Sequence, residues 1–373
     1  MNVLHLLVSG GTGGIEVLMK NYAQTSTHRN IFVFVWKSGE IAEIMIKNGT
    51  PVYTLEAAKD GVFETLKKIY RICTEERVDV VVSHNSAPLL KLALLYMKMR
   101  NPKVRTVAYA HANARDICEY KRKKGLTIRK AVHRMGFAIA DGIVAISDSV
   151  KESLQTYLKV DGKKIRRIYN GTKVSANVDL CPEKSRQDEL RLIYVGRLIP
   201  EKGVQNTLRM LAEVKRDIPY AFTIVGDGPY RKELERYAET LGIADRARFL
   251  GRREDVAELL AASDVFIHLP DWEEGFGITV IEALAEGCIC IVNDRGALPE
   301  IIENGKDGYV VPADAVDAAA GLLKDLWGKP EASWQQLRVC ARQKAHHFSM
   351  DHFVKNLDDF LWDIALAAEQ NQK

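Results

Sequence analysis

The sequence predicts an α/β protein built from two doubly wound, Rossmann-like domains that face one cleft. Three observations lead to this fold class. Short runs rich in Val and Ile alternate with amphipathic stretches, which is the pattern of parallel sheets covered by helices. The alternation pauses once, in the polar segment 171–190, and then resumes. A chain of 373 residues is also long enough for roughly two domains.

The first half of the chain, residues 1–170, is expected to form the N-terminal domain. Apolar runs predict its strands and amphipathic spacing predicts its helices. The strands are expected over 3–8, 31–35, 78–83, 103–109 and 142–146, with helices such as 16–25, 62–77 and 149–159 between them. The segment 171–190 contains Pro182 and has no periodicity, so it is interpreted as a linker.

The second half repeats the pattern and predicts a C-terminal domain over 191–347. Its strands are expected near 191–195, 221–225, 246–250, 264–268, 289–292 and 308–311. Residues 348–373 then contain a long amphipathic helix that runs to about Ala368. That helix needs an apolar surface to cover Phe353, Leu357, Phe360, Leu361 and Ile364.

Composition excludes several classes of protein. The hydrophobic fraction of 47% with mixed charge is that of an ordinary globular protein. No apolar run reaches the roughly 18 residues that span a bilayer, and a strand begins at Val3, which leaves no room for a signal peptide. A cytoplasmic protein is therefore expected. The six Cys form no C-x-x-C pair, so buried reduced thiols are expected rather than disulfides or zinc.

Charge divides unequally between the halves. Residues 1–170 carry 28 Lys and Arg against 15 Asp and Glu, whereas residues 171–373 carry 25 against 34. The densest basic stretch contains Lys121, Arg122, Lys123 and Lys124, and basic residues continue to position 134. It lacks the interleaved aromatics that stack on bases, so a membrane surface or a phosphorylated lipid suits it better than nucleic acid. The alternative is a solvated basic loop.

The stretch from Glu273 to Ala283 is the most informative part of the sequence. Glu274 precedes an expected helix, and Gly residues on both sides of Phe276 leave backbone N–H groups open at its N-terminus, which attracts anions and hydroxyl-bearing ligands. Glu282 lies in an apolar helical run, where a buried carboxylate needs hydrogen-bond donors. A plain helix-start signal would explain the first glutamates, but neither the glycines nor the setting of Glu282.

Two loops are candidates for holding phosphate. Ser9 to Glu16 follows the first strand and is rich in Gly, although it matches neither the dinucleotide fingerprint nor a Walker motif. Arg197 and Lys202 follow the first strand of the second half, and this pair of cations suits a pyrophosphate. The alternative is a pair of surface cations, with Lys202 bonded to Glu201. Asp227, in the next tight turn, is interpreted as structural.

Together these motifs resemble the retaining glycosyltransferases of family four, of the bacterial polysaccharide type, which have the two-domain GT-B fold. The resemblance runs over nearly the whole chain, and Glu274 and Glu282 stand at the spacing of the family's E-x7-E motif. The matching parts are Gly13 to Glu16, Tyr169 to Gly171, Gly196 to Leu198 with Lys202-Gly203, Val225 to Pro229, Glu274 to Gly277 with Glu282, and Gly296 to Glu300.

The resemblance implies a nucleoside-diphosphate sugar donor held mainly by the C-terminal domain and an acceptor held by the N-terminal one. The implied catalytic residues are Glu274, His111, Arg197 and Lys202. In the family's pattern Arg197 and Lys202 bind the pyrophosphate, Glu274 the sugar hydroxyls and Glu282 the ribose. The implied backbone contacts come from Gly13, Gly14, Phe276, Gly277 and Ile278.

His111 resembles the family histidine that reaches the donor sugar, and the similarly placed His84 could be confused with it. The C-terminal helix is expected to return to the N-terminal domain, as in relatives. Transfer with retention is implied, in which the leaving phosphate oxygen takes the acceptor proton. No D-x-D motif occurs, so no metal or other cofactor is expected.

Two departures from the family pattern lie near the expected donor sugar. The chain has Pro270-Asp271-Trp272 where Pro-Ser is common, and Arg295-Gly296-Ala297 where a Gly-Gly pair is frequent. They bear on the identity of the sugar more than on the reaction.

The preferred hypothesis is transfer of a hexosyl group, from a UDP-sugar by preference, to a lipid-linked or saccharide acceptor in capsule, exopolysaccharide or O-antigen synthesis. The enzyme would be cytoplasmic or peripheral on the inner face of the membrane. The alternatives are a nucleotide-sugar epimerase on the same fold and a catalytically silent binding subunit. Sucrose-, glycogen- or trehalose-type synthesis uses similar machinery and is a further possibility.

Overall fold

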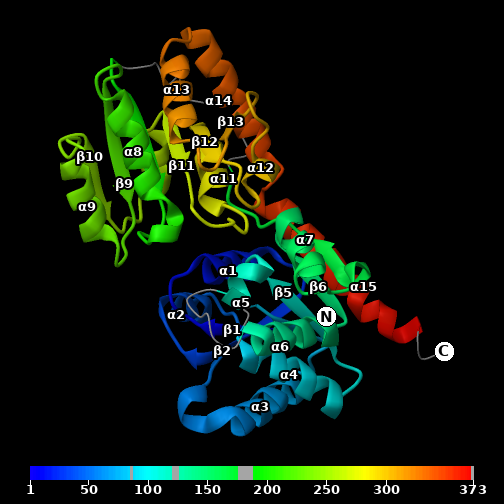
Figure 1. Cartoon of the computed structure of the whole chain (residues 1–373). Helices are drawn as coiled ribbons and strands as arrows, with labels where there is room; N and C mark the ends of the chain where they lie inside the picture. Colours follow the sequence, from blue (N-terminus) through cyan, green and yellow to red (C-terminus); the bar gives the residue numbers. More distant parts are fainter. Residues whose placement is uncertain (85–86, 120–125, 175–187, 371–373) are drawn as a thin grey trace. The chain divides into compact units, whose positions relative to one another are not determined.

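The structure is a computed structural model that describes residues 1–84, 87–119, 126–174 and 188–370. The chain divides into two compact units. Unit 1 comprises Met1–Gly171 and Met350–Lys373, and unit 2 comprises Thr172–Ser349. Each unit contains one parallel sheet with helices between successive strands (Figure 1). The predicted α/β class with two Rossmann-like domains is therefore confirmed.

Unit 1 has a seven-stranded sheet in the order β3-β2-β1-β4-β5-β6-β7. Its strands are β1 (Asn2–Ser9), β2 (Arg29–Lys37), β3 (Val52–Thr54), β4 (Val80–Ser83), β5 (Arg105–Ala110), β6 (Gly142–Ala145) and β7 (Ile165–Arg167). Its helices are α1 (Gly14–Thr25), α2 (Glu40–Lys47), α3 (Ala57–Glu75), α4 (Pro88–Arg100), α5 (Ala114–Glu119), α6 (Leu126–Ile139), α7 (Asp148–Thr156) and α15 (Met350–Gln370). Strand order reverses between β1 and β4, and sheets of this kind bind ligands beyond the carboxyl ends of such strands.

Unit 2 has a six-stranded sheet in the order β10-β9-β8-β11-β12-β13, with its reversal between β8 and β11. Its strands are β8 (Leu190–Val195), β9 (Tyr220–Val225), β10 (Ala247–Gly251), β11 (Val265–His268), β12 (Ile289–Asn293) and β13 (Gly308–Val311). Its helices are α8 (Val204–Val214), α9 (Arg231–Thr240), α10 (Val256–Ala261), α11 (Ile278–Ala285), α12 (Leu298–Ile301), α13 (Val316–Trp327) and α14 (Glu331–His346).

The central strands are buried on both faces, which explains why they read as nearly continuous apolar runs. Every residue of β4, β6, β11 and β12 is buried. The strands β3 and β7 were not predicted; they lie at opposite edges of the unit 1 sheet and have three residues each. Runs this short carry too few side chains to show a period.

The C-terminal helix α15 packs within unit 1. Asp358 accepts hydrogen bonds from the Tyr22 hydroxyl at 2.6 Å, from Ser26 Oγ at 2.8 Å, and from the Thr27 amide and hydroxyl at 3.0 and 2.9 Å. Its Phe353, Leu357, Phe360 and Leu361 are buried, as their spacing requires.

The first and last residues of unit 2 are paired with each other. Thr172 forms a β-bridge with Ser349, and the Thr172 amide donates to the Phe348 carbonyl at 3.0 Å. None of the described helices is long and apolar enough to cross a membrane. The five cysteines within the described ranges are free thiols, and four of them are buried.

Candidate functional site

Glu274 is the centre of the site in unit 2. It follows β11, is 9% exposed, and collects three donors on one carboxylate oxygen, Oε2. These are Lys202 Nζ at 2.6 Å, His268 Nε2 at 3.1 Å and Trp272 Nε1 at 3.5 Å. Burial alone would raise the pKa of the Glu274 carboxyl, but the Lys202 charge and the His268 hydrogen bond hold that pKa well below its ordinary value. Glu274 is therefore ionised, and no described residue binds its Oε1.

The turn at Gly296 holds the loop that carries Glu274. The Ala297 amide donates to the Glu274 carbonyl at 2.8 Å, and the Gly296 amide donates to Glu273 Oε2 at 2.7 Å. Gly296 has φ of 62°, and a Cβ there would lie 2.2 Å from the Glu274 carbonyl oxygen. The position that departs from a family Gly-Gly pair therefore keeps the one glycine that the geometry requires.

Arg197 and Lys202 lie beyond the carboxyl end of β8, at the reversal of strand order. Arg197 is exposed, whereas the Lys202 side chain is 16% exposed and paired with Glu274. Gly203 has φ of 72°, and a Cβ there would lie 1.8 Å from the Leu269 carbonyl oxygen, so the two loops touch backbone to backbone. Lys202 is thus neither a solvated cation nor bonded to Glu201 but part of the Glu274 cluster.

The neighbouring loop, which follows β9, supports the Arg197 loop. The Leu198 amide donates to the Asp227 carbonyl at 3.0 Å, and a Cβ on Gly226 would lie 1.9 Å from the Gly196 carbonyl oxygen. The Asp227 carboxylate accepts from the Gly228 amide at 2.8 Å. These contacts agree with the structural interpretation of Asp227.

Helix α11 begins where the Gly-Phe-Gly sequence predicted. Gly277 is its N-cap with φ of 106°, Ile278 is its first residue, and Phe276 is buried edge-on against Phe348 with ring centroids 5.8 Å apart. The first amides of a helix have no acceptor within it, so they are available to an anion or a hydroxyl. The buried Phe276 ring holds the backbone of this turn in place, because moving the ring outward would expose its apolar surface.

Glu282 lies on α11 and is only partly buried, not wholly buried as the apolar run suggested. Among the described residues its carboxylate has no hydrogen-bond donor, and burial raises its pKa to about 7. A carboxyl group that lacks donors in the protein is suited to take them from a ligand.

In unit 1, Gly13 is the N-cap of α1 and Gly14 its first residue. A Cβ on Gly13 would lie 2.3 Å from Glu16 Oε2, so a side chain at this position would have to displace the Glu16 carboxylate. The turn lies beyond the carboxyl end of β1, next to the reversal of strand order, which is where phosphate-binding turns occur.

His111 follows β5 and is partly buried. His84, which is similarly placed in the sequence, is its hydrogen-bond partner, because His84 Nδ1 lies 3.2 Å from His111 Nε2. Tyr109 stacks on His111 with ring centroids 4.2 Å apart and an interplanar angle of 5°. The two histidines thus belong to one stacked and hydrogen-bonded group.

The predicted basic residues Lys121, Arg122, Lys123 and Lys124 lie outside the described residues. Helix α6 is described, and much of its solvent face is apolar. Ile128 is 72% exposed, Val132 38% and Met135 57%, at spacings that place them on one side of the helix. A helix face of this kind is uncommon on a solvated surface.

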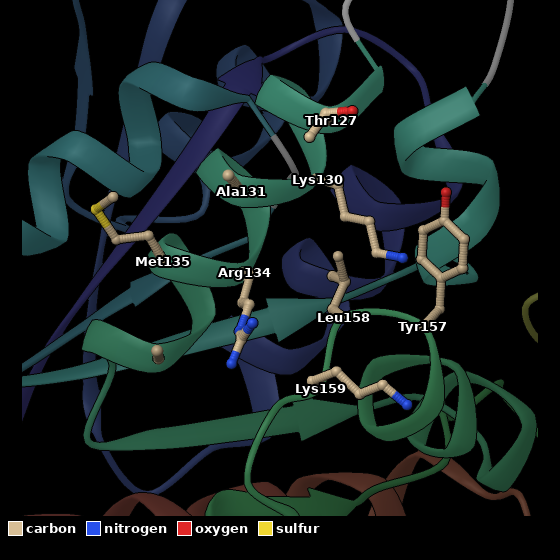
Figure 2. A pocket seen from close by; sticks show the side chains of 9 residues that line it. Thr127, Lys130, Ala131, Arg134, Met135, Tyr157, Leu158 and Lys159 are labelled. Carbon is tan, nitrogen blue, oxygen red and sulfur yellow. The ribbon is translucent and has the colours of Figure 1, made fainter.

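A groove of about 370 Å³ runs beside that face, between α6 and the end of α7 (Figure 2). Lys130, Arg134 and Lys159 line it, and Figure 2 shows Lys130 reaching toward the Tyr157 ring, with its ammonium 3.9 Å from the ring centroid. The groove therefore combines cations with the apolar side chains of Leu158 and Met135.

Sequence reasoning identified Lys202 and Glu274 but missed their partners. His268 ends β11 and Trp272 follows it; the Trp was noticed only as a departure from the family pattern. The signal for His268 was a polar residue closing an apolar strand at the reversal of strand order. Within the described ranges, no group of three or more His, Cys, Asp or Glu side chains is arranged to hold a metal ion.

Two family models match the chain and together span most of it. Residues 12–175 match Glycosyltransferase Family 4, and residues 181–343 match Glycosyl transferases group 1. With the two Rossmann-like units, these matches show that the chain belongs to the GT-B glycosyltransferases of the family-four type.

Two sequence relatives and one solved structure are similar to this chain over most of its length. N-acetyl-alpha-D-glucosaminyl L-malate synthase from Bacillus anthracis is 27% identical over 317 residues, covering 82% of this chain and 80% of the relative. UDP-Gal:alpha-D-GlcNAc-diphosphoundecaprenol alpha-1,3-galactosyltransferase from Escherichia coli is 26% identical over 272 residues, covering 70% and 69%. The crystal structure of Anabaena HepE in complex with UDP superposes with a TM-score of 0.81 over 97% of this chain and 100% of that one, at 19% identity, and so shares the fold.

Proposed function

We propose that this glycosyltransferase moves a hexosyl group, with retention and without a metal, from a nucleoside-diphosphate sugar to a lipid-linked or saccharide acceptor. A UDP-sugar is the preferred donor, and capsule, exopolysaccharide or O-antigen synthesis the proposed pathway. The observation that carries this proposal is the Glu274 carboxylate, kept ionised by Lys202 at the sheet edge where Arg197 is exposed. A carboxylate for hydroxyls beside cations for phosphates suits a sugar diphosphate.

Each polar group of the cluster has a proposed task. Glu274 Oε1 accepts hydrogen bonds from sugar hydroxyls, since the described donors all bind Oε2. The Lys202 ammonium has three donors and gives one to Glu274, so the others can reach the diphosphate. Arg197 adds a planar fork for the same group. Glu282 takes the ribose hydroxyls.

The backbone and unit 1 complete the proposal. Amides of Phe276, Gly277 and Ile278 at the start of α11 would contact sugar or phosphate. Gly13 and Gly14 of unit 1 would contact the phosphates, and His111 the donor sugar. No cofactor is needed in this scheme, because cations and helix termini stabilise the departing diphosphate.

In the proposed reaction the bond from the anomeric carbon to the phosphate oxygen breaks while the acceptor oxygen bonds to the same face. The acceptor hydroxyl proton passes to the departing phosphate oxygen, so the chain itself supplies no base. Charge gathers on the diphosphate as it leaves, and Arg197 and Lys202 offset it. The Escherichia coli relative, named for a UDP-Gal donor and a diphosphoundecaprenol acceptor, supports a similar pair of substrates here.

The apolar face of α6 supports the proposal of a membrane-bound acceptor. Ile128, Val132 and Met135 can enter the interfacial region of a leaflet while Lys130 and Arg134 meet anionic headgroups. This arrangement would hold the enzyme on the inner face of the membrane, where a lipid-linked acceptor is presented.

Calorimetry with UDP, GDP and ADP and their sugars, with EDTA and then with Mg²⁺, tests the donor assignment. We expect one diphosphate to bind without metal, Arg197→Ala to weaken that binding, and Glu274→Ala to abolish transfer while the fold persists. The anomeric configuration of the product, read by NMR, tests retention. Normal turnover in both variants would refute the site.

Measuring donor consumption with and without acceptor separates the alternatives. An epimerase would consume donor when no acceptor is present, whereas a transferase requires the acceptor. A silent binding subunit would bind donor without consuming it under any condition.

Cosedimentation with vesicles tests the lipid surface. Ile128→Ser with Met135→Ser should weaken binding to vesicles containing phosphatidylglycerol by about tenfold, because two side chains lose apolar burial. Met99→Ser is the matched control, since Met99 is 74% exposed on α4 of the same unit. Neutralising Lys121, Arg122, Lys123 and Lys124 should also weaken vesicle binding and leave donor binding unchanged. Equal binding by all variants would reject this surface.

A further inference from the structure

Three histidines of unit 1 form a continuous hydrogen-bonded chain across three adjacent strands. His5 lies within β1, His84 follows β4 and His111 follows β5. His5 Nδ1 lies 2.8 Å from His84 Nε2, and His84 Nδ1 lies 3.2 Å from His111 Nε2. His5 and His84 are completely buried, so the chain runs from the interior to the edge where His111 is partly exposed.

Asn30, on β2, fixes the donor-to-acceptor direction of the hydrogen bonds between the three histidines. Its amide nitrogen donates to the His28 carbonyl at 3.1 Å, so its oxygen is the atom that faces His5 Nε2, at 2.9 Å. That oxygen can only accept, and therefore His5 Nε2 carries the proton. A neutral imidazole has one N–H, so His5 Nδ1 is bare and must accept from His84.

The protonated nitrogens of His84 and His111 follow from that of His5. His84 donates from Nε2 to His5, which leaves its Nδ1 bare to accept from His111 Nε2. All three rings are then the Nε2–H tautomer. The ring nitrogen left at the end of the chain, His111 Nδ1, is an acceptor.

Burial keeps the rings neutral, because a second proton on His5 or His84 would place an uncompensated charge in the interior of unit 1. Burial lowers the pKa of His5 to about 4 and that of His111 to about 3, and lowers the pKa of His84 well below its ordinary value. Neighbouring positive charge from Lys91 acts on His111 in the same direction.

Aromatic stacking holds the rings in the planes that these hydrogen bonds need. Phe32 stacks on His5 with centroids 4.7 Å apart and an interplanar angle of 14°. Tyr109 stacks on His84 at 5.0 Å and on His111 at 4.2 Å. Rotation out of these planes would break the stacks, and a 180° flip would put ring carbons in place of the bonded nitrogens, so each ring keeps one orientation.

We propose that Asn30, His5 and His84 are positioning residues that fix His111 as a hydrogen-bond acceptor for a substrate hydroxyl. The identity of the molecule that carries this hydroxyl rests on the proposed function, in which His111 contacts the donor sugar. The fixed tautomer of His111 does not depend on that function. The sugar hydroxyl then donates to His111 Nδ1, and His111 itself gives no proton to the substrate.

A matched pair of variants at His84 tests the last link. In His84→Asn the side-chain oxygen can replace Nδ1 as the acceptor for His111, whereas His84→Leu, of similar size, offers none. Histidine-selective ¹⁵N labelling with two-bond correlation spectra reports the tautomer of each ring in the full-length protein. Spectra of His→Gln variants assign the signals.

We expect the Nε2–H tautomer at His5, His84 and His111 in the wild type, retention at His111 in His84→Asn, and a mixture of tautomers in His84→Leu. The KM for the donor sugar should rise about fivefold in His84→Leu, the effect of weakening one hydrogen bond, while the Kd for the free nucleoside diphosphate stays unchanged. Where His84→Leu does not fold, Asn30→Leu tests the other end of the chain, with the same mixture expected at His111.

Three outcomes would overturn the proposal. These are an Nδ1–H or charged His111 in the wild type, an unchanged His111 tautomer in both Leu variants, and identical spectra and KM for His84→Asn and His84→Leu. A wild-type protein that turns over no nucleotide sugar would reject the proposed function instead, and the spectra would still decide the tautomer.

Discussion

Replacing Lys202 with Met should destabilise unit 2, because it leaves the Glu274 carboxylate buried without its counter-charge. The Nζ–Oε2 distance is 2.6 Å and the two side chains are 16% and 11% exposed, so the pair is largely desolvated. Removing one partner from such a pair costs about 3–5 kcal/mol. His268 and Trp272 still donate to the carboxylate at 3.1 and 3.5 Å, so the lower end, about 3 kcal/mol, is expected.

The effect should depend on pH in a defined direction. The pKa of Glu274 lies below its ordinary value of 4.5, so its ionisation stabilises the fold above pH 4.5 and that contribution is lost as pH falls further. In Lys202→Met the pKa of Glu274 rises, so the variant loses less of its free energy of unfolding when the pH is lowered. The difference from the wild type should therefore be largest at pH 7 and shrink below pH 4.5.

Urea unfolding followed by hydrogen exchange and mass spectrometry measures this, because peptides from β11 report on unit 2 separately from unit 1. The control is Glu274→Gln, alone and combined with Lys202→Met. Once the carboxylate is gone, Lys202→Met should cost about 1 kcal/mol or less, because the lost lysine no longer faces a charge. A Lys202→Met penalty that is the same in the wild-type and Glu274→Gln backgrounds, or the same at pH 7 and pH 4, would refute this reasoning.

Three further predictions concern other groups. Glu282, with its pKa near 7, should bind ribose hydroxyls as the carboxylate, so calorimetry should show tighter UDP-sugar binding at pH 8 than at pH 6, with proton release, and Glu282→Gln should remove both effects. Lys91 is buried with its ammonium over Phe137, and burial lowers its pKa from 10.5 to about 7. Folding therefore releases the Lys91 proton at pH values between about 7 and 10.5, which costs free energy. Lys91→Met removes this cost, so it should stabilise the protein against urea by about 1–3 kcal/mol at pH 7 and by less at pH 9.5. A loss of stability at pH 7 would contradict this prediction. Asp358→Ala should cost about 3 kcal/mol by removing the hydrogen bonds to Tyr22 and its neighbours, and should expose α15 to limited proteolysis, whereas an uncut helix would argue that apolar packing alone holds it.

The fold was largely predictable because its strands are buried on both faces. Runs such as Val80 to Val82 and Ile289 to Val292 have no polar face, and only helices on both sides of a parallel sheet can cover them. The three-residue strands β3 and β7 were missed because they lie at sheet edges, where tertiary pairing rather than composition makes a strand.

The site was predictable in its residue types but not in its pairings. The ends of β8 and β11 had to meet at one sheet edge, which placed Lys202 and Glu274 in the same region. Which oxygen Lys202 binds, and that His268 binds the same one, depends on backbone contacts such as that of Gly203 with Leu269. The histidine chain was missed because its members stand 79 and 27 residues apart, and only strand order makes them neighbours.

The two units place different chemistry at the same point of the same fold. In each, a histidine lies at the carboxyl end of the strand beside the reversal of strand order, His84 after β4 and His268 at the end of β11. His268 donates to an ionised carboxylate that is paired with Lys202, so unit 2 presents charged groups, and its cations Lys202 and Arg197 suit a diphosphate. His84 instead accepts from another neutral ring, so unit 1 presents an uncharged acceptor. A neutral acceptor suits a sugar hydroxyl, because it orients the hydroxyl without adding a charge that would compete with the departing phosphate.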